Sequence, residues 1–507
     1  MVGRVFLYIR SIVLVCVITV GFTAPLQAAD PAADAVQEAE GLKKLGDDYA
    51  AKDEVRSAAD AYEQALVLAR DHFTVNERVR MAVILSWDDR LSASIRELRS
   101  VLERDPANRN ARIHLARIYS WDGQLDRAVS IADSLLSDSP DDKETLLVKA
   151  NALEWDDRFN EAIPVYEDII KRDGDFDARV GLAFSHLYKG NRTEARRQAD
   201  ALVADDARQR RQLQRLSDAI DREMRARMEV GYDYSSDSDG NHFGRYSARY
   251  RVAVGNHDFG VSLGRTGTNW AIWSDDVMFQ THINASGAVG LAAGIGMARL
   301  HSPGIAQFPT GYLQLHGRSR RTTVSGTVSS EVLNETSELI ANRVRRLSAG
   351  GEVTQKITSL WSVSGAYSRA RFSDTNYAND AQVRTEYAVR LAPRVSFGYQ
   401  LRFLDYGGQA GSGYFDPDDF VSHRFSAAIE LERRRYFTFL QIYGGHQKFE
   451  RNDFRTSEWV KGGRASFGVN LSTNFAVSVN VAAGDFSTGS ISGYRYFTAG
   501  TRVSYRF

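Results

Sequence analysis

One short pattern recurs at a fixed interval in the first half of the chain, and it constrains the fold more than any other feature. The segments SWDDRLSASI, SWDGQLDRAV and EWDDRFNEAI share a tryptophan followed by an aspartate, and their tryptophans, Trp87, Trp121 and Trp155, are 34 residues apart (121 − 87 and 155 − 121). A fainter copy, YKGNRTEA, begins at Tyr188. A period of this length predicts stacked helical hairpins, because each hairpin needs a neighbour to bury its apolar face.

The residues inside the period resemble the tetratricopeptide repeat, a helix-turn-helix unit of about 34 residues. Ala116 and Ala128 stand where two helices must approach closely, and Gly123 stands in the turn between them. Ala58 and Ala65 hold the matching places in an earlier copy. We therefore expect residues 30–204 to form a solenoid of about five such repeats.

The Trp-Asp turns allow two interpretations. The rings of Trp87, Trp121 and Trp155 can cover the ends of both helices, while the following aspartate caps the next helix. Alternatively, these rings and Tyr188 form a surface where a protein docks or sugars stack. The sequence favours the packing role.

Residues 205–226 predict a charged capping helix. Its apolar side chains recur at spacings of three and four residues, which places them on one helical face: Leu213, Leu216, Ile220, Met224 and Met228. We expect this face to cover the end of the solenoid, since a terminal repeat otherwise exposes apolar surface.

The amino-terminal segment predicts secretion. Arg4 and Arg10 come before an apolar stretch over residues 11–22, and APLQAAD follows. This order describes a signal peptide, here residues 1–29. The single cysteine, Cys16, lies inside it, which excludes disulfides and cysteine chemistry from the mature chain. Basic and acidic residues are equal at 64 each, so no global field favours nucleic acid as a partner.

From about Arg227 onward the helical period disappears and polar and apolar residues alternate, as in RYSARYRVAV and YFTAGTRVSYRF. A period of two predicts strands, and strands of ten or more residues suit a tilted membrane crossing. Short connections such as GN and RRR alternate with the longer segments LHSPGIAQF, VLNETSELIAN, SDTNYANDA and GGQAGSGYFDPDD. The predicted fold class is therefore α + β, a helical solenoid followed over residues 227–507 by an antiparallel transmembrane β-barrel of about 16 strands.

A barrel of this size encloses an aqueous channel. The charged residues on the polar face of the strands are the candidates to line it: Arg249, Arg251, Arg384, Glu386, Arg390, Arg402, Glu430, Glu432, Arg464, Arg502 and Arg506. We interpret these charges either as mutual pairs that stiffen the wall or as contacts for a passing substrate.

The segment GGQAGSGYFDPDDF is the candidate external or plug loop, with Tyr414, Phe415, Asp416 and Pro417 at its centre. A position inside the lumen would favour a channel, and a position outside would favour surface binding. No cofactor, metal or enzymatic activity is expected, because no nucleophile elbow, zinc-binding pair or phosphate-binding loop occurs in the sequence.

The signal peptide, the Trp-Asp repeats and a carboxyl-terminal barrel that ends in Phe507 together resemble the YaiO-type outer-membrane family. The architecture is more distantly similar to the outer-membrane exporters of cellulose and poly-N-acetylglucosamine, and GYFDPDDF resembles an element of those barrels. The resemblance implies a bacterial outer-membrane protein with its helical part in the periplasm, in contact with outer-membrane lipid and the barrel assembly machinery.

Two functions are consistent with these observations. The leading hypothesis is a channel that exports a polysaccharide or another surface polymer, with the repeats docking a periplasmic or inner-membrane synthase or modifying protein. The alternative is a non-transporting anchor, adhesin or receptor whose repeats bind proteins.

Overall fold

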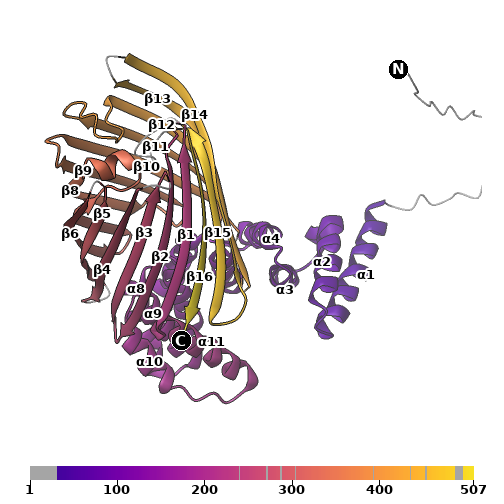
Figure 1. Cartoon of the computed structure of the whole chain (residues 1–507). Coiled ribbons are helices and arrows are strands. Elements are labelled where there is room, and N and C mark those ends of the chain that lie inside the picture. The colour runs from indigo at the N-terminus through magenta and orange to yellow at the C-terminus, as the bar shows by residue number, and fades with distance from the viewer. Residues whose placement is uncertain are drawn as a thin grey trace, which may run out of the picture. The chain divides into compact units, whose positions relative to one another are not determined.

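The computed structural model of the chain describes residues 31–238, 240–269, 272–285, 288–302, 304–391, 393–433, 435–451, 454–485 and 495–507 (Figure 1). The expected signal peptide lies outside these residues. The chain is helical as far as Met224 and forms strands from Arg227 onward, apart from the short helix α12 (Ser337–Ala341). It divides into two compact units, one that ends at Arg90 and one that begins at Leu91.

The first unit contains helices α1 (Pro31–Ala51), α2 (Val55–Ala69) and α3 (Val75–Trp87), with the 3-10 helix η1 (Arg70–His72) before α3. Tyr62 is buried and lies directly over Gly46, where an added Cβ would be 2.5 Å from the ring. The small residue therefore lets α1 and α2 pack closely. Thr74 and Glu77 form a capping box that starts α3.

The helices of the second unit are α4 (Leu91–Arg104), α5 (Arg109–Trp121), α6 (Leu125–Asp138), α7 (Lys143–Trp155), α8 (Phe159–Asp173), α9 (Phe176–Tyr188), α10 (Arg192–Asp200) and α11 (Ala207–Met224). Consecutive helices pack on one another, and Ala116 and Ala128 are fully buried or nearly so, as close packing requires. None of the described helices is long and apolar enough to cross a membrane.

The repeated turn reverses the chain through its third residue. Gly123 and Asp157 have positive φ angles of 78° and 59°, a left-handed conformation that ends helices α5 and α7. The prediction that the aspartate caps the next helix is wrong, because α6 and α8 begin without a side-chain cap. Asp122 and Asp156 instead are the C-cap residues of α5 and α7, directly after the tryptophans.

Helix α11 covers the end of the helical stack. Leu216 and Ile220 are fully buried against Leu187 of α9 and against α10, with Leu213 and Met224 packed beside them. The expected stripe is wrong only at Met228, which lies on strand β1 because the helix ends four residues earlier.

The strands are β1 (Arg227–Asp237), β2 (His242–Val254), β3 (His257–Thr268), β4 (Ile272–Asn284), β5 (Val289–His301), β6 (Ile305–Ser319), β7 (Thr322–Val332), β8 (Arg345–Lys356), β9 (Trp361–Phe372), β10 (Tyr377–Leu391), β11 (Arg394–Tyr406), β12 (Asp418–Glu432), β13 (Tyr436–Arg451), β14 (Phe454–Asn470), β15 (Phe475–Asp485) and β16 (Arg495–Arg506). Each strand pairs with its sequence neighbours, and β1 pairs with β16 to close the barrel. The predicted antiparallel barrel of 16 strands is confirmed.

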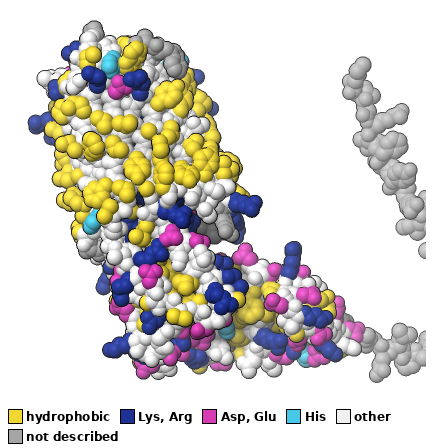
Figure 2. All heavy atoms as spheres, turned by 60° about the horizontal axis from the view of Figure 1, so that its bottom comes forward, with side chains coloured by type: hydrophobic (Ala, Val, Ile, Leu, Met, Phe, Trp, Pro, Cys, Tyr) yellow, Lys and Arg dark blue, Asp and Glu magenta, His cyan; other side chains and the backbone are white. Residues whose placement is uncertain are grey.

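The outer face of the barrel is apolar. Phe425 and Ile429 on β12 are exposed, and their neighbours Arg424 and Glu430 point to the opposite face by strand alternation. Figure 2 shows hydrophobic side chains covering the outside of the barrel, whereas charged side chains crowd the helical region. This arrangement, apolar outside and polar inside, is that of an outer-membrane barrel.

The predicted alternation of connection lengths holds only in part. Strands β5 and β6 take up most of LHSPGIAQF, and β10 takes up most of SDTNYANDA, so both connections are short. Among the described connections, residues 333–344 and 407–417 are the long ones. The short connections lie at the opposite end of the barrel. Arg227, which begins β1, and Arg506, which ends β16, lie at the same end as these short connections.

Candidate functional site

The strand register places ten of the eleven predicted lumen residues on the inner face, opposite the exposed apolar side chains. These are Arg249, Arg251, Arg384, Glu386, Arg402, Glu430, Glu432, Arg464, Arg502 and Arg506. The exception is Arg390. A register shift between Ala388 and Arg390 pairs Arg390 with Val395 of the outer face, and this bulge turns the arginine away from the lumen.

Several inner-face charges form pairs within the wall. Arg402 binds Asp380 at 2.7 Å, and Arg502 binds Asp233 at 3.0 Å. Glu386 accepts from Arg394 at 2.7 Å. The acidic partners and Arg394 were not among the predicted residues, although they occupy the same alternating polar positions and could have been found by extending that pattern. These pairs support the wall-stiffening interpretation for the residues that form them.

Other inner-face charges have no such partner. Within the described part of the chain, Arg249, Arg384 and Arg506 have no carboxylate at ion-pair distance, and Glu430 and Glu432 have no cation. Arg464 donates to the neutral Gln441 at 2.8 Å instead. These side chains are available to a molecule in the lumen.

Aromatic rings lie flat against the inner wall. Tyr443 lies over Gly462 and Gly484, where an added Cβ would come within 2.3 Å and 2.2 Å of its hydroxyl oxygen. Tyr312 covers Gly294 in the same way. The Arg424 guanidinium lies over the Tyr443 ring, 4.8 Å from its centroid, so this ring is packed within the wall.

The predicted external or plug loop folds into the barrel. Tyr414 and Phe415 are 1% and 4% exposed, and Pro417 is buried as well. Tyr414 stacks on Phe372 with ring centroids 4.6 Å apart. Phe372 belongs to the inner face of β9, so the loop lies inside the lumen, at the end of the barrel where the long connections are.

The other long connection, with helix α12, meets this loop and reaches the far wall. Asn342 donates to the Ser412 carbonyl at 3.3 Å. Asn334 donates to Ser274 of β4 at 2.8 Å, and its loop therefore contacts the wall at β4. We call residues 333–344 and 407–417 together the plug.

An ion pair connects the opposite side of the plug to the barrel wall. Asp416 lies 3.5 Å from Arg451 of β13 and accepts from the Ala410 backbone at 2.7 Å. In a barrel of sixteen strands, β4 and β13 lie on opposite sides. The plug therefore crosses the lumen.

The repeat turns contact the other end of the barrel. Arg321, in the turn between β6 and β7, donates to Asp126 of α6 and at 2.7 Å to Asp156. Lys356 of β8 binds Asp157 at 2.9 Å. The backbone N–H of Ser359 donates to Asp126 at 3.0 Å. The turns after α5 and α7 are thus tied to two neighbouring strand connections.

The next repeat turn continues the same contact. Arg192, at the start of α10, binds Asp258 of β3 at 2.9 Å. The Thr193 backbone N–H donates to Asn256, in the turn between β2 and β3, at 3.0 Å. Successive repeat turns therefore contact successive short connections, at the end of the barrel where β1 begins.

Burial shapes the titration of the acids in these turns. Burial raises the pKa of Asp156, whose side chain is 1% exposed, and the Arg321 guanidinium offsets part of this effect. Burial also raises the pKa of Glu154 to about 7, although the Tyr166 hydroxyl donates to this carboxylate at 2.8 Å. Glu154 precedes Trp155 and was missed, since serine holds this place in the two earlier copies.

The aromatic rings of the repeat turns are partly packed and partly exposed. Trp87, Trp121 and Trp155 are 59%, 42% and 48% exposed, and Tyr188 is 59% exposed. Tyr188 stacks on Phe184 with ring centroids 5.8 Å apart, and the Phe159 ring centroid is 6.4 Å away. Each ring therefore has a covered part and an exposed part, and both the packing role and the docking role stay predictions.

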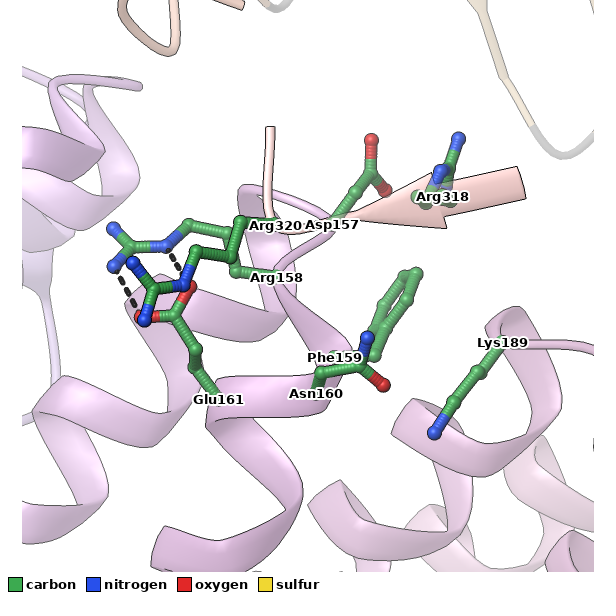
Figure 3. Close-up of a pocket in the computed structure, with 8 residues that line it drawn as sticks. All are labelled: Asp157, Arg158, Phe159, Asn160, Glu161, Lys189, Arg318 and Arg320. Carbon is green, nitrogen blue, oxygen red and sulfur yellow. Dashed lines mark hydrogen bonds and ion pairs between the residues drawn. The ribbon is translucent and has the colours of Figure 1, made fainter. Parts of the chain in front are cut away.

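A basic recess lies where α8 and α9 face the barrel (Figure 3). Lys189 from the helices and Arg318 and Arg320 from the barrel line it, and Arg158 binds Glu161 at its edge at 2.7 Å. Its volume of about 10 Å³ admits one water molecule and no sugar ring. Within the described chain, Lys189, Arg318 and Arg320 form no ion pair.

Comparison with known proteins matches residues 88–152 to a family model described as a tetratricopeptide repeat. A bacterial polysaccharide outer-membrane secretin of known structure is 12% identical, over 56% of this chain and 99% of that one, with a TM-score of 0.46. CdiB from Acinetobacter baumannii is 12% identical, over 55% of this chain and 60% of that one, with a TM-score of 0.36. A repeat protein from Parabacteroides merdae is 18% identical, over 36% and 74%, with a TM-score of 0.30.

No curated protein sequence matches the chain. The family match agrees with the tetratricopeptide repeats expected from the 34-residue period. Membership of the YaiO-type family stays a prediction.

Proposed function

We propose that the protein is an outer-membrane channel that exports a polysaccharide or a similar surface polymer. The junction is the observation that carries this proposal: successive repeat turns are bound to successive short connections around one end of the lumen. Short connections of outer-membrane barrels face the periplasm. A helical surface held at that end is placed to deliver a polymer from the periplasm.

The inner face supports transport of a sugar polymer. It carries the aromatic ring of Tyr312 and charged side chains that form no ion pair among the described residues, such as Arg384. The exposed rings Trp121 and Trp155 add possible stacking or docking positions on the helices. A synthase or modifying protein would bind there, because stacked repeats recognise partners along an extended surface.

The plug accounts for how such a channel stays closed between transport events. Its two loops meet each other and both walls, so it must move or deform before a polymer passes. We expect it to rest in this closed position, because the aromatic cluster around Tyr414 buries the apolar surface that opening would expose.

Conductance in a planar bilayer tests the channel. Because the Leu333 N–H donates to the Val344 carbonyl, residues 334–343 can be replaced by an Asn-Gly hairpin turn. We expect low conductance from the wild-type chain and a stable open current from this variant. Tyr414→Ala should open in the same way, while Tyr246→Ala, on the outer face, should stay closed.

A folded plug variant without current would contradict the channel. That result would favour the second candidate, a non-transporting anchor or receptor, for which the exposed turn rings supply a docking surface.

A further inference from the structure

Three arginines stand side by side at the short-connection end of the lumen. Arg227 on β1 is directly opposite Arg506 on β16 and directly opposite Arg251 on β2, all on the inner face. Neighbouring strands are about 4.8 Å apart, and like charges in facing positions repel one another. This row costs stability unless negative charge offsets it.

The wall supplies only part of that negative charge. Glu229 binds Arg227 at 3.0 Å but also lies 4.0 Å from Arg502. Asp258 lies 3.7 Å from Arg251 but is bound more closely, at 2.9 Å, by Arg192 of the helical region. Asp258 is thus shared between two arginines, whereas Glu229 serves mainly Arg227, because Asp233 binds Arg502 at 3.0 Å.

Two arginines on this wall have no acidic partner among the described residues. Arg249, two residues above Arg251 on the same face, and Arg506 have no carboxylate at ion-pair distance within the described chain. The Nε atom of Arg227 is buried and has no hydrogen-bond partner. The wall therefore presents guanidinium donors that its own residues do not satisfy.

The basic recess at the helical junction repeats this imbalance. Lys189, Arg318 and Arg320 line it and form no ion pair among the described residues (Figure 3). Its two carboxylates, Asp157 and Glu161, are bound by Lys356 and Arg158. Its small volume fits a contact with a charged substituent at the surface and not the enclosure of a sugar. The acidic Glu430 and Glu432 belong to β12, another part of the wall.

We propose that the exported polymer is anionic and that these arginines receive it where it enters the lumen. This inference rests on the proposed export function. Guanidinium groups bind carboxylates and phosphates through paired N–H donors, so a sugar polymer with uronate, phosphate or sulfate groups has the required chemistry. Lipid headgroups are not the target, because the row faces the lumen and the apolar face meets the membrane.

Calorimetric titration of the full chain in detergent tests the proposal. The probes are hexagalacturonate, a phosphorylated maltohexaose and unmodified maltohexaose. We expect at least one anionic probe to bind ten or more times more tightly than the neutral probe, with affinity that falls as salt rises. The better of the two anionic probes distinguishes a carboxylate-bearing polymer from a phosphate-bearing one.

The variants Arg249→Gln and Arg506→Gln should each weaken anionic binding about tenfold, the loss of one charged contact. Arg390→Gln is the matched control, because the bulge turns Arg390 to the outer face. Equal affinity for all three probes, binding of none of them, or equal losses in the control would overturn the proposal. An open current from the plug variant alongside such a result would leave the export channel standing and remove only the anionic substrate.

Discussion

Glu154 offers a quantitative test of how the helical region is built. Its carboxyl group lies beside Tyr166, which is fully buried and donates to it, and burial raises the pKa to about 7 from the ordinary value of 4.5. The folded chain therefore holds this proton over a pH range in which the unfolded chain has released it. By linkage, the free energy of unfolding falls as pH rises from about 4.5 to about 7.

The size of the effect follows from the pKa difference. One pKa unit corresponds to about 1.4 kcal/mol, so a shift from 4.5 to about 7 gives a loss of about 3 kcal/mol. The contribution is fully present below the unfolded pKa and absent above the folded one. Glu154→Gln removes the titration and keeps an acceptor for Tyr166, so it should be more stable than wild type at pH 8.

Urea titration of the full chain in detergent, followed by circular dichroism at 222 nm, measures this difference. The wild-type helical transition should shift to lower urea between pH 5 and pH 8, and the Glu154→Gln transition should shift less. Glu161→Gln is the control, because the Arg158 guanidinium lowers the pKa of Glu161 below its ordinary value of 4.5, so its contribution is lost only below that pH and this variant should follow the wild-type profile from pH 5 to pH 8. Parallel pH profiles for wild type and Glu154→Gln would refute the reasoning.

Three further changes test the junction and the repeats. Arg321→Ala leaves the buried Asp156 with only the more distant Arg158, at 3.9 Å, and should destabilise the helical region by about 3 kcal/mol in the same urea titration, whereas Arg320→Ala should change it little. Gly181→Ala places a Cβ 2.4 Å from the Tyr166 ring and should lower the midpoint by an amount equivalent to about 1–3 kcal/mol; an unchanged midpoint would mean that the ring moves freely. Trp155→Ala should cost about 1 kcal/mol or less, because half of the ring is in solvent; a loss as large as that of Tyr166→Ala would support the packing role.

The fold could be predicted because both halves carry a strong period. The 34-residue repeat sets the helical hairpins, and strict alternation sets strands with one apolar face. The bulge at Arg390 could not be predicted in this way, since alternation alone continues through a register shift. The position of Met228 was missed for a related reason: its spacing continues the helical stripe although the backbone has already changed to a strand.

The candidate site was less predictable, because it depends on contacts between distant segments. Arg321 and Asp156 are 165 residues apart in sequence, and nothing local marks them as partners. The burial of Tyr414 depends on Phe372 and on the loop that contains α12. The Trp-Asp motif is plain in the sequence, but it does not reveal that Asp156 binds the barrel while Trp155 stays half exposed.

A disulfide that fixes the plug in place provides the most direct test of polymer export through this lumen. The only cysteine, Cys16, lies in the expected signal peptide, so Ser274→Cys with Asn334→Cys adds one cysteine pair to the mature chain, at positions whose side chains are 2.8 Å apart. Surface and released carbohydrate would be measured in cells that produce this variant, under oxidising conditions and after reduction. We predict that the disulfide stops export and that reduction restores it. Unchanged export with the disulfide fully formed would contradict a polymer path through this lumen.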